Sequence, residues 1–483
     1  MNKAAGLVLT AAALLPGGCA LGPDFHAPPP PQALGYLRPT PPSAEKPAPD
    51  AVVQSVHPGT DLPAQWWQLF ASAALDAAVK SAIAHNPTIE SATATLAQAR
   101  EQVVVARAAL LPRVTGSAGV EHSAGTATSL QQGATNLYSL GASASYALDI
   151  FGAARRALEQ QQAQAELQRY QLAAAYLALT GNVVSEALTI ASTRLQISTT
   201  QDLINSDRKN LALTQHEFEE GTAARSDVLT ADSQLAADLT QLPSLQQQLE
   251  AARDAMNILL GRSPEVPDLH DFDISELTVP KSLPLSLPSE LVRQRPDILS
   301  AEAQLHAASA AVGVAVAQEF PSLTLSASLT REALTAGNLF HQFGTAWDVG
   351  SGLTAPIFEG GALRAQARGA RDAFMAQQAA YRGVVLEGLG QVADDLWALQ
   401  HDAERLSVYT HSLQIAADSL KLQQTSYAVG RSNVLALIDA ERTYAQARLG
   451  YATAQIEQLQ DTAGLFVALG GSWWQDGVAQ GTP

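Results

Sequence analysis

The chain has little cysteine and little charge. Cys19 is the only cysteine in 483 residues, so an internal disulfide is excluded, and a zinc or iron-sulfur site built on several thiolates is nearly so. Charged residues make up 16% of the sequence, against roughly 25% in an average soluble domain, while 47% of the residues are hydrophobic. The chain can therefore bury a large core, and much of its polarity comes from uncharged side chains.

Basic residues and catalytic motifs are also scarce. The 29 Lys and Arg residues face 46 Asp and Glu residues, a net charge of −17, which argues against binding nucleic acid through its phosphates. The 10 histidines are scattered, with no His-Glu-x-x-His, no Cys-His cluster and no Gly-x-Ser-x-Gly. We expect no catalytic residue, no metal and no cofactor, and hence no enzyme.

The N-terminus has the pattern of a secretory signal peptide over residues 1–18. Lys3 supplies the positive charge, and Ala4 to Leu15 form an apolar run that is too short to span a bilayer. The stretch Leu15-Pro16-Gly17-Gly18-Cys19 resembles a bacterial lipobox, although Pro16 stands where that pattern has an apolar residue such as Leu. The resemblance implies that a covalent lipid is attached to Cys19; the alternative is a chance cysteine after an ordinary signal peptide.

The residues after Cys19 predict a tether. Ala20 follows the cysteine, in place of the Asp that resembles an inner-membrane retention signal, so the outer membrane is favoured. Residues 19–65 are rich in proline, which favours an extended and semi-rigid segment. The tether would connect the lipid to the body of the protein.

The rest of the sequence is a tandem repeat. Positions 209 residues apart match along its length, for example Asn86-Pro87 with Arg295-Pro296, Gly221 with Gly430, and Leu260-Gly261 with Leu469-Gly470. We place the first repeat at 66–275, the second at 276–474 and a tail at 475–483. Trp66-Trp67 and Trp473-Trp474 bracket this body, and we expect them to pack where the ends of the two halves meet.

Each repeat is predicted to contain one very long helix, at 152–219 and at 360–428. In the first, apolar residues recur at alternating steps of four and three from Ala163 to Leu195, and a second apolar stripe runs from Leu172 to Ile190. A helix with two apolar stripes contacts neighbours on two sides, as in a closed ring of helices. At 1.5 Å per residue each helix is about 100 Å long.

Two strands are predicted in each repeat, near 113–122 and 138–150 and near 322–332 and 345–357. Apolar residues alternate there with Ser, Gly and Thr, which fits a sheet with lipid on one face, although a half-buried soluble sheet shows the same period. Four strands cannot close a barrel, and a membrane sheet cannot leave its edges unpaired, so several chains must share one barrel. A scaffolding coiled-coil surface lipoprotein would explain the long helices but not the duplicated strands.

The chain resembles the outer-membrane efflux proteins, the TolC-like channel-tunnels, and in particular their lipoprotein branch, which includes the NodT-like proteins. The resemblance covers Cys19 to Trp474 and is carried by Cys19-Ala20-Leu21-Gly22-Pro23-Asp24-Phe25, Phe218-Glu219-Glu220-Gly221, Asp227-Val228-Leu229, Tyr427-Ala428-Val429-Gly430, Leu437-Ile438-Asp439-Ala440 and Ala468-Leu469-Gly470-Gly471-Ser472-Trp473.

This resemblance implies an α+β membrane protein: a homotrimeric channel-tunnel with a shared 12-stranded transmembrane β-barrel and a long periplasmic α-helical barrel. It implies a periplasmic adaptor (membrane fusion) protein and an inner-membrane pump of the RND or a related type as partners, and an exit duct for drugs or toxic small molecules. A duct for type I protein secretion has the same architecture and is the alternative within transport.

The resemblance also implies a gate at the turns that end the long helices. Asp439 matches an aspartate that forms an acidic ring at the constriction, Leu435 matches an apolar ring beside it, and Asp227 matches an aspartate that latches to Arg431 or Arg442. The simpler interpretation of Asp439 is a surface carboxylate paired with Arg442 or Lys421. We expect Gly221, Thr222, Gly430 and Ser432 to contact the adaptor, although helix capping alone would explain both glycines.

Overall fold

The structure is a computed structural model that describes residues 20–30, 35–37, 54–124, 134–266, 270–340 and 344–471. Its internal contacts divide the chain into two compact units, and each draws segments from both repeats. The first, here called the strand unit, comprises Met1–Pro28, Thr95–Gln168 and Ser300–Arg382. The second, the helical unit, comprises Pro29–Ala94, Arg169–Leu299 and Gly383–Pro483.

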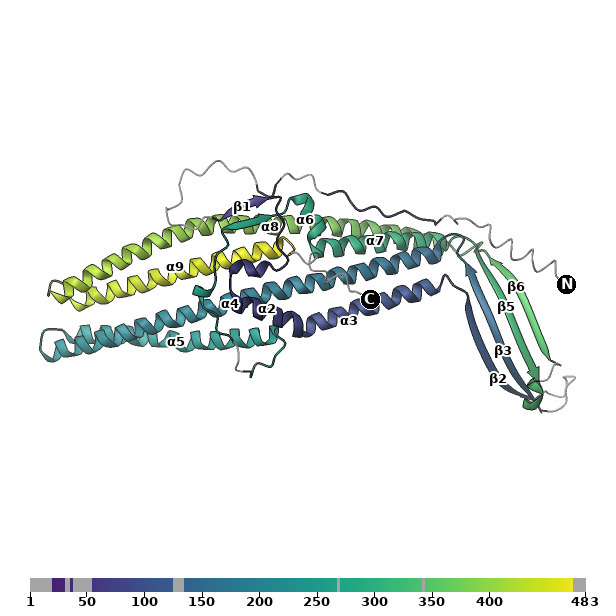
Figure 1. The fold of residues 1–483 in the computed structure, drawn as a ribbon, viewed down its shortest axis with the longest axis horizontal. Coiled ribbons are helices and arrows are strands. Elements are labelled where there is room, and N and C mark those ends of the chain that lie inside the picture. Colours follow the sequence, from purple (N-terminus) through teal and green to yellow (C-terminus); the bar gives the residue numbers. More distant parts are fainter. Residues whose placement is uncertain are drawn as a thin grey trace. The chain divides into compact units, whose positions relative to one another are not determined.

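A four-stranded antiparallel sheet dominates the strand unit (Figure 1). Its strands are β2 (Arg113–Ala124), β3 (Ala134–Leu148), β5 (Ser322–Ala333) and β6 (Thr345–Thr354), in the order β2-β3-β5-β6. The hairpin β2-β3 comes from the first repeat and β5-β6 from the second. Strand β3 pairs with β5, so the two repeats are hydrogen-bonded to each other in the middle of the sheet. Among the described strands, β2 and β6 each pair on one side only.

The sheet register separates an apolar face from a small polar face. On one face Ala142 pairs with Leu329, which pairs with Trp347. On the other face Thr115, Ser143, Ser328 and Asp348 form a continuous polar row, with the Thr115 and Ser143 hydroxyl oxygens 2.8 Å apart. The apolar face is open to its surroundings: Val114 is 73% exposed, Trp347 74% and Val349 75%. Exposed apolar area of this kind marks a surface that meets lipid or another protein.

Local chemistry determines where two strands end. Strand β3 stops at Leu148, before the expected 150, because the carboxylate of Asp149 caps the next helix and accepts hydrogen bonds from the backbone N–H groups of Ala154 and Arg155, at 3.0 and 2.9 Å. Strand β6 stops at Thr354, short of the expected 357. Pro356 follows two residues later and has no N–H to continue the ladder.

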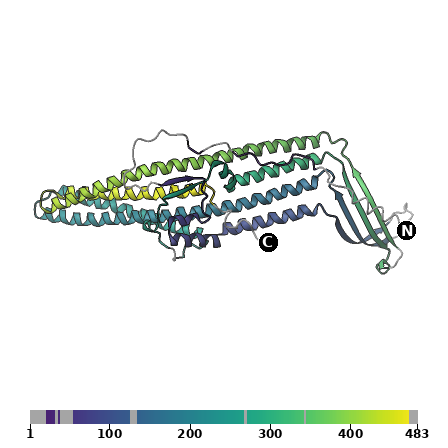
Figure 2. The same cartoon turned by 45° about the horizontal axis from the view of Figure 1, so that its top comes forward.

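Both repeats contain the same helices at the same spacing. The first has α3 (Pro87–Ala108), α4 (Ala153–Glu219) and α5 (Arg225–Leu259), and the second has α7 (Pro296–Ala317), α8 (Ala362–Ala428) and α9 (Val434–Ala468). Each of these three pairs is offset by 209 residues at both ends. Helices α4 and α8 have 67 residues each, about 100 Å at 1.5 Å per residue. Figure 2 shows the same elements from a second direction.

The core of the helical unit is centred on aromatic side chains. It includes η2 (Trp66–Phe70), α2 (Ala73–His85), η3 (Ile274–Glu276), α6 (Pro288–Gln294) and a parallel pair of short strands, β1 (Ser55–Pro58) and β4 (Ser282–Leu285). The rings of Trp66 and Phe70 pack against Phe466 near the end of α9, at 5.8 and 6.2 Å between centroids. Trp66 is thus packed against the end of the second repeat, and Trp67 packs edge-on against Trp66. Trp473 and Trp474 lie outside the described residues.

The junctions between the returning and the short helices follow one plan in both repeats. The side-chain amide of Asn86 donates to the carbonyl oxygen of Leu259 at the end of α5, at 2.9 Å. At the equivalent junction the Arg295 guanidinium donates to the carbonyl oxygen of Ala468 at the end of α9, at 2.8 Å. The last carbonyl groups of a helix lack a partner within the helix, and these side chains supply one.

Candidate gate at the helix turns

The turns at the ends of α4 and α8 have the same backbone. Gly221 has φ of 75° and Gly430 φ of 71°, in the left-handed region that side chains disfavour. The N–H of Thr222 returns to the carbonyl oxygen of Glu217, and that of Arg431 to Ser426, both at 2.8 Å. A side chain at either glycine would meet no heavy atom within 4 Å, so these turns need glycine for its conformation and not for space.

Side chains in both turns cap the returning helices. The Asp227 carboxylate accepts from the backbone N–H of Ala224 at 3.1 Å, and its other oxygen accepts from the Ser226 hydroxyl at 3.4 Å. In the other turn the Asn433 side chain accepts from the N–H of Ala436 at 2.9 Å. Within one chain, Asp227 therefore serves the first turn of α5.

Leu435 and Asp439 lie one helical turn apart on α9, and both are exposed. Residues four apart share one face of a helix, so the apolar and the acidic group form adjacent layers. Among the described residues Asp439 forms no ion pair, and the ion-pair partner of Arg442 is Asp238, with their charged atoms 2.5 Å apart. A surface pair between Asp439 and Arg442 is therefore absent from the chain.

The structure does not bring the two expected latch partners to Asp227. Arg442 pairs with Asp238 on α5, and Arg431 is an exposed residue in the turn after α8. A link between the two turns comes instead from Tyr427, whose hydroxyl donates to the carboxylate of Glu217 at 3.2 Å. Burial and the neighbouring Glu217 raise the pKa of Tyr427 above its ordinary value, so this tyrosine keeps its proton.

A carboxylate pair that sequence reasoning missed lies between α4, α5 and α9. Asp207 and Asp238 are 6% and 3% exposed and share a hydrogen bond, and Arg442 and Glu441 complete the cluster. Within the described part of the chain, no N–H or O–H group donates to the buried Oδ2 of Asp207. Burial, with the like charge of Asp238 in contact, raises the pKa of Asp207 to about 7.

A second pair, between α8 and α9, repeats this chemistry. Asp402 is 1% exposed and hydrogen-bonds to Asp461, while Arg405 contacts Asp402 at 3.0 Å. Burial and Asp461 again raise the pKa of Asp402. In both clusters two carboxyl groups join a long helix to a returning helix beside one arginine, which comes from α9 in the first cluster and from α8 in the second. A raised pKa within such a pair favours a shared proton.

The other predicted sites fall into two groups. Cys19 lies outside the described residues, which begin at Ala20. Gly221, Thr222, Gly430 and Ser432 lie in the turns; the first three are exposed, and the Ser432 hydroxyl donates to Gln423 at 3.0 Å. In the described part of the chain no three His, Asp or Glu side chains are placed to hold a metal ion.

Comparison with known proteins assigns these features to one family. The family model of the outer membrane efflux proteins matches the chain twice, at residues 78–262 and 287–471. Both ends of the second match lie 209 residues after those of the first, so the family unit is the repeat found in the sequence.

Individual relatives extend over nearly the full length. The pyoverdine export outer membrane protein OpmQ of Pseudomonas aeruginosa is 30% identical over 85% of this chain and 88% of its own. The toluene efflux pump outer membrane protein TtgC of Pseudomonas putida is 28% identical over 97% of this chain and 96% of its own. The solved outer-membrane channel OprN superimposes with a TM-score of 0.84 at 28% identity, covering 94% of this chain and all of that one.

The two family matches follow the tandem repeat, and a solved outer-membrane channel shares the fold that contains the strand pairs and the long helices. The chain has the channel-tunnel fold, which confirms the fold class expected from the sequence. It belongs to the outer membrane efflux protein family and is a subunit of an outer-membrane efflux channel.

Proposed function

We propose that three copies of this chain form the exit duct of a tripartite pump that expels drugs or other toxic small molecules. The observation that carries the assembly is the four-stranded sheet. Its apolar face is exposed, and among the strands that the structure describes β2 and β6 each pair on one side only. Lipid offers no hydrogen bonds to such edges, so another copy must provide them. Three copies give 12 strands, as the family resemblance implies.

The membrane attachment has two parts in this proposal. The sheets span the outer membrane, the helices reach into the periplasm, and Cys19 carries a lipid. Blocking lipoprotein signal peptidase should leave a precursor of lower electrophoretic mobility. An unchanged mobility would contradict the lipid anchor. It would not bear on the proposal that the chain forms a channel.

The gate is proposed to lie where the turns of the three copies converge. Leu435 and Asp439 form adjacent layers on α9, so three copies would form an apolar ring beside an acidic ring. Carboxylates gathered around an axis attract cations and repel one another. A latch from Asp227 to Arg431 or Arg442 would then join different copies, because within one chain Arg442 is already paired with Asp238.

The partners are proposed to be a periplasmic adaptor and an inner-membrane pump of the RND or a related type. The turns at Gly221-Thr222 and Gly430-Ser432 are the docking points, since they are the ends of long helical hairpins. The chain contributes passage and no chemistry of its own, and it needs no cofactor beyond its lipid.

Small molecules are the proposed cargo because relatives are named for the export of pyoverdine and of toluene. Deletion of the gene, followed by a susceptibility panel of dyes, detergents and antibiotics, tests this. We expect increased sensitivity that the full chain restores. Unchanged sensitivity together with the loss of a secreted protein would instead assign the duct to protein secretion, and a purified protein that is monomeric and does not conduct would exclude a channel.

A further inference from the structure

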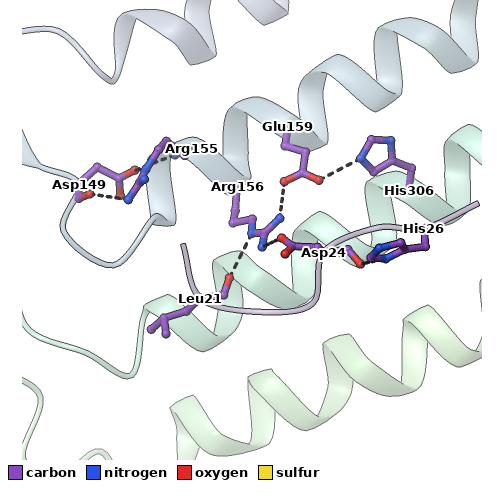
Figure 3. Close-up of polar contacts among 8 residues, drawn as sticks. All are labelled: Leu21, Asp24, His26, Asp149, Arg155, Arg156, Glu159 and His306. Atoms are coloured by element: carbon purple, nitrogen blue, oxygen red, sulfur yellow. Dashed lines mark hydrogen bonds and ion pairs between the residues drawn. The ribbon is translucent and has the colours of Figure 1, made fainter. Parts of the chain in front are cut away.

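The segment that follows Cys19 is bound to the strand unit by its backbone. The N–H of Leu21 donates to the carbonyl oxygen of Phe151 at 3.1 Å. The Leu21 carbonyl oxygen accepts from Nε of Arg156, also at 3.1 Å (Figure 3). Phe151 lies between the end of β3 and the start of α4. Both backbone groups of Leu21 are therefore used, so the position of this residue is fixed.

Arg156 is the centre of the contact. Its residue is 5% exposed, and its two terminal nitrogens bind Asp24 at 2.6 Å and Glu159 at 2.7 Å. The other oxygen of Glu159 lies 2.9 Å from Nε2 of His306 on α7 (Figure 3). A buried guanidinium needs all its partners, and the segment supplies two of them, the Leu21 carbonyl and the Asp24 carboxylate.

Shape complements this charge pairing. Gly22 has φ of 95°, and a side chain there would come within 2.5 Å of the backbone of Gly313 on α7. A side chain at Gly313 would lie 2.7 Å from Arg156 and 2.9 Å from the Leu21 carbonyl oxygen. The ring of Phe25 stacks on His306 with centroids 4.4 Å apart. The backbones of the segment and of α7 thus lie so close at Gly22 and Gly313 that neither position has room for a side chain.

The second repeat shows that the helices do not need these residues for their own packing. The positions 209 residues away carry different chemistry: Arg156 corresponds to Ala365, Glu159 to Arg368, His306 to Ala97 and Gly313 to Val104. Helices α4 and α8 have the same length, and so do α3 and α7. The two repeats therefore carry different residues at each of these four positions.

We propose that Arg156, Glu159, His306 and Gly313 form a docking site for the chain's own segment Leu21–Phe25, and that this site holds Cys19 beside the helix-side rim of the sheet. Only Ala20 lies between Cys19 and Leu21, so the Cα atoms of Cys19 and Leu21 are within about 7 Å of each other. If Cys19 carries the lipid proposed above, the acyl chains leave the protein next to the end of β3. The segment Leu21–Phe25 then holds the lipid attachment point at a fixed position on the strand unit.

The test measures the position of the segment in the full-length protein. Spin labels are attached at Ala27→Cys, two residues after the segment, and at Gln304→Cys on α7, both exposed residues, and labelled chains are diluted with unlabelled ones. The measurement is made with Cys19 and with Cys19→Ser, so that docking is read with and without lipid. We expect one narrow distance distribution in both backgrounds.

Two variants should broaden that distribution. Arg156→Gln removes the ion pair with Asp24, and Gly313→Ala fills the contact while favouring the helix, so α7 remains folded. His26→Ala is the matched control, because His26 is exposed and its ring hydrogen-bonds to the backbone carbonyl of Asp24, so its loss should leave the distance unchanged.

A broad distribution in the parent protein would overturn the proposal, and so would a narrow one that survives both Arg156→Gln and Gly313→Ala. A distribution that is narrow only in the lipidated protein would show that the lipid, and not residues 21–25, holds the segment. Failure of acylation appears separately, as an electrophoretic mobility that does not change with Cys19→Ser. That result would refute the lipid anchor on Cys19. The distance between the two spin labels would still show whether the segment is docked.

Discussion

Arg442 holds Asp238 in an ion pair with 2.5 Å between their charged atoms, and the same aspartate is hydrogen-bonded to Asp207. One arginine thus faces two buried carboxyl groups. A shared proton resolves the excess of negative charge, because two neighbouring carboxylates titrate as a pair with one pKa raised.

This cluster predicts that the helical unit is more stable at mildly acidic pH. The folded pKa of Asp207, about 7, lies above its ordinary 3.8, so the folded state holds the proton more tightly. The contribution of Asp207 to stability is therefore greatest at low pH and is lost as pH rises from about 4 to about 7.

Asp207→Asn imitates the protonated form. We expect it to raise the free energy of unfolding at pH 8 by about 1 kcal/mol and to flatten its dependence on pH. Thermal unfolding followed by helical circular dichroism at pH 5.5 and 8 measures this. Asp232→Asn, an exposed position on α5, is the control, and an equal pH dependence in parent and Asp207→Asn would contradict the prediction.

Removal of the proposed acidic ring should make the closed channel leak. Asp439→Ala takes one exposed carboxylate from each copy, so we expect higher conductance in a planar bilayer and a weaker preference for cations. Asp418→Ala removes an exposed carboxylate from α8 and should leave both properties as in the parent. Identical records for Asp439→Ala and the parent would exclude the ring.

Substitutions at Gly221 and Gly430 can distinguish the capping of the helices from the proposed docking of the adaptor. Gly430→Val strains a left-handed backbone and should lower stability by about 1 kcal/mol. Gly430→Asn tolerates that backbone, so it should keep stability while its side chain projects from the turn. Loss of drug resistance in cells with Gly430→Asn, at normal protein level, would support docking at the turn; full resistance would leave the glycine with capping alone. Gly221→Asn tests the other turn in the same way.

The helix junctions should differ in their sensitivity to mutation. Arg295 is buried and binds the Ala468 carbonyl, Asp297 and Gln391, so Arg295→Ala should cost about 3 kcal/mol in the free energy of unfolding. Asn86→Ala leaves the neutral Leu259 carbonyl unpaired and should cost about 1 kcal/mol. Arg293→Ala, at an exposed position, is the control. Equal losses for Arg295→Ala and Asn86→Ala in thermal unfolding would refute this ranking.

Much of this architecture could be predicted because its signals are local. The period of two in the strands and the 3.6-residue period in the helices do not depend on what each element contacts. The offset between Gly221 and Gly430 relates the two repeats before any contact is known. The ends of β3 and β6 were predicted less well, because both strands stop earlier than the period of two suggested. For β3 the reason is the capping of α4 by Asp149, which depends on where that helix begins.

The carboxylate pair could not be predicted because it depends on which helices meet. Asp207 continues the apolar stripe that runs from Leu172 to Ile190 at helical spacing, so its burial could have been inferred. Its partners, however, come from α5 in the first repeat and α9 in the second. The Arg156 site escaped prediction for the same reason, as Asp24 and His306 are far apart in the sequence and the pairing depends on the fold.

The pairing of β3 with β5 leaves the first repeat's strand β2 at one border of the sheet and the second repeat's strand β6 at the other. In a ring closed by rotation, β6 of each copy must therefore meet β2 of the next, and an antiparallel alternation continues without a break. Each contact between hairpins, within one subunit or between two, then pairs a β2-β3 hairpin with a β5-β6 hairpin. A damaged hairpin would disturb its own subunit and a neighbour together, so mixed assemblies of intact and defective copies should fail as a whole.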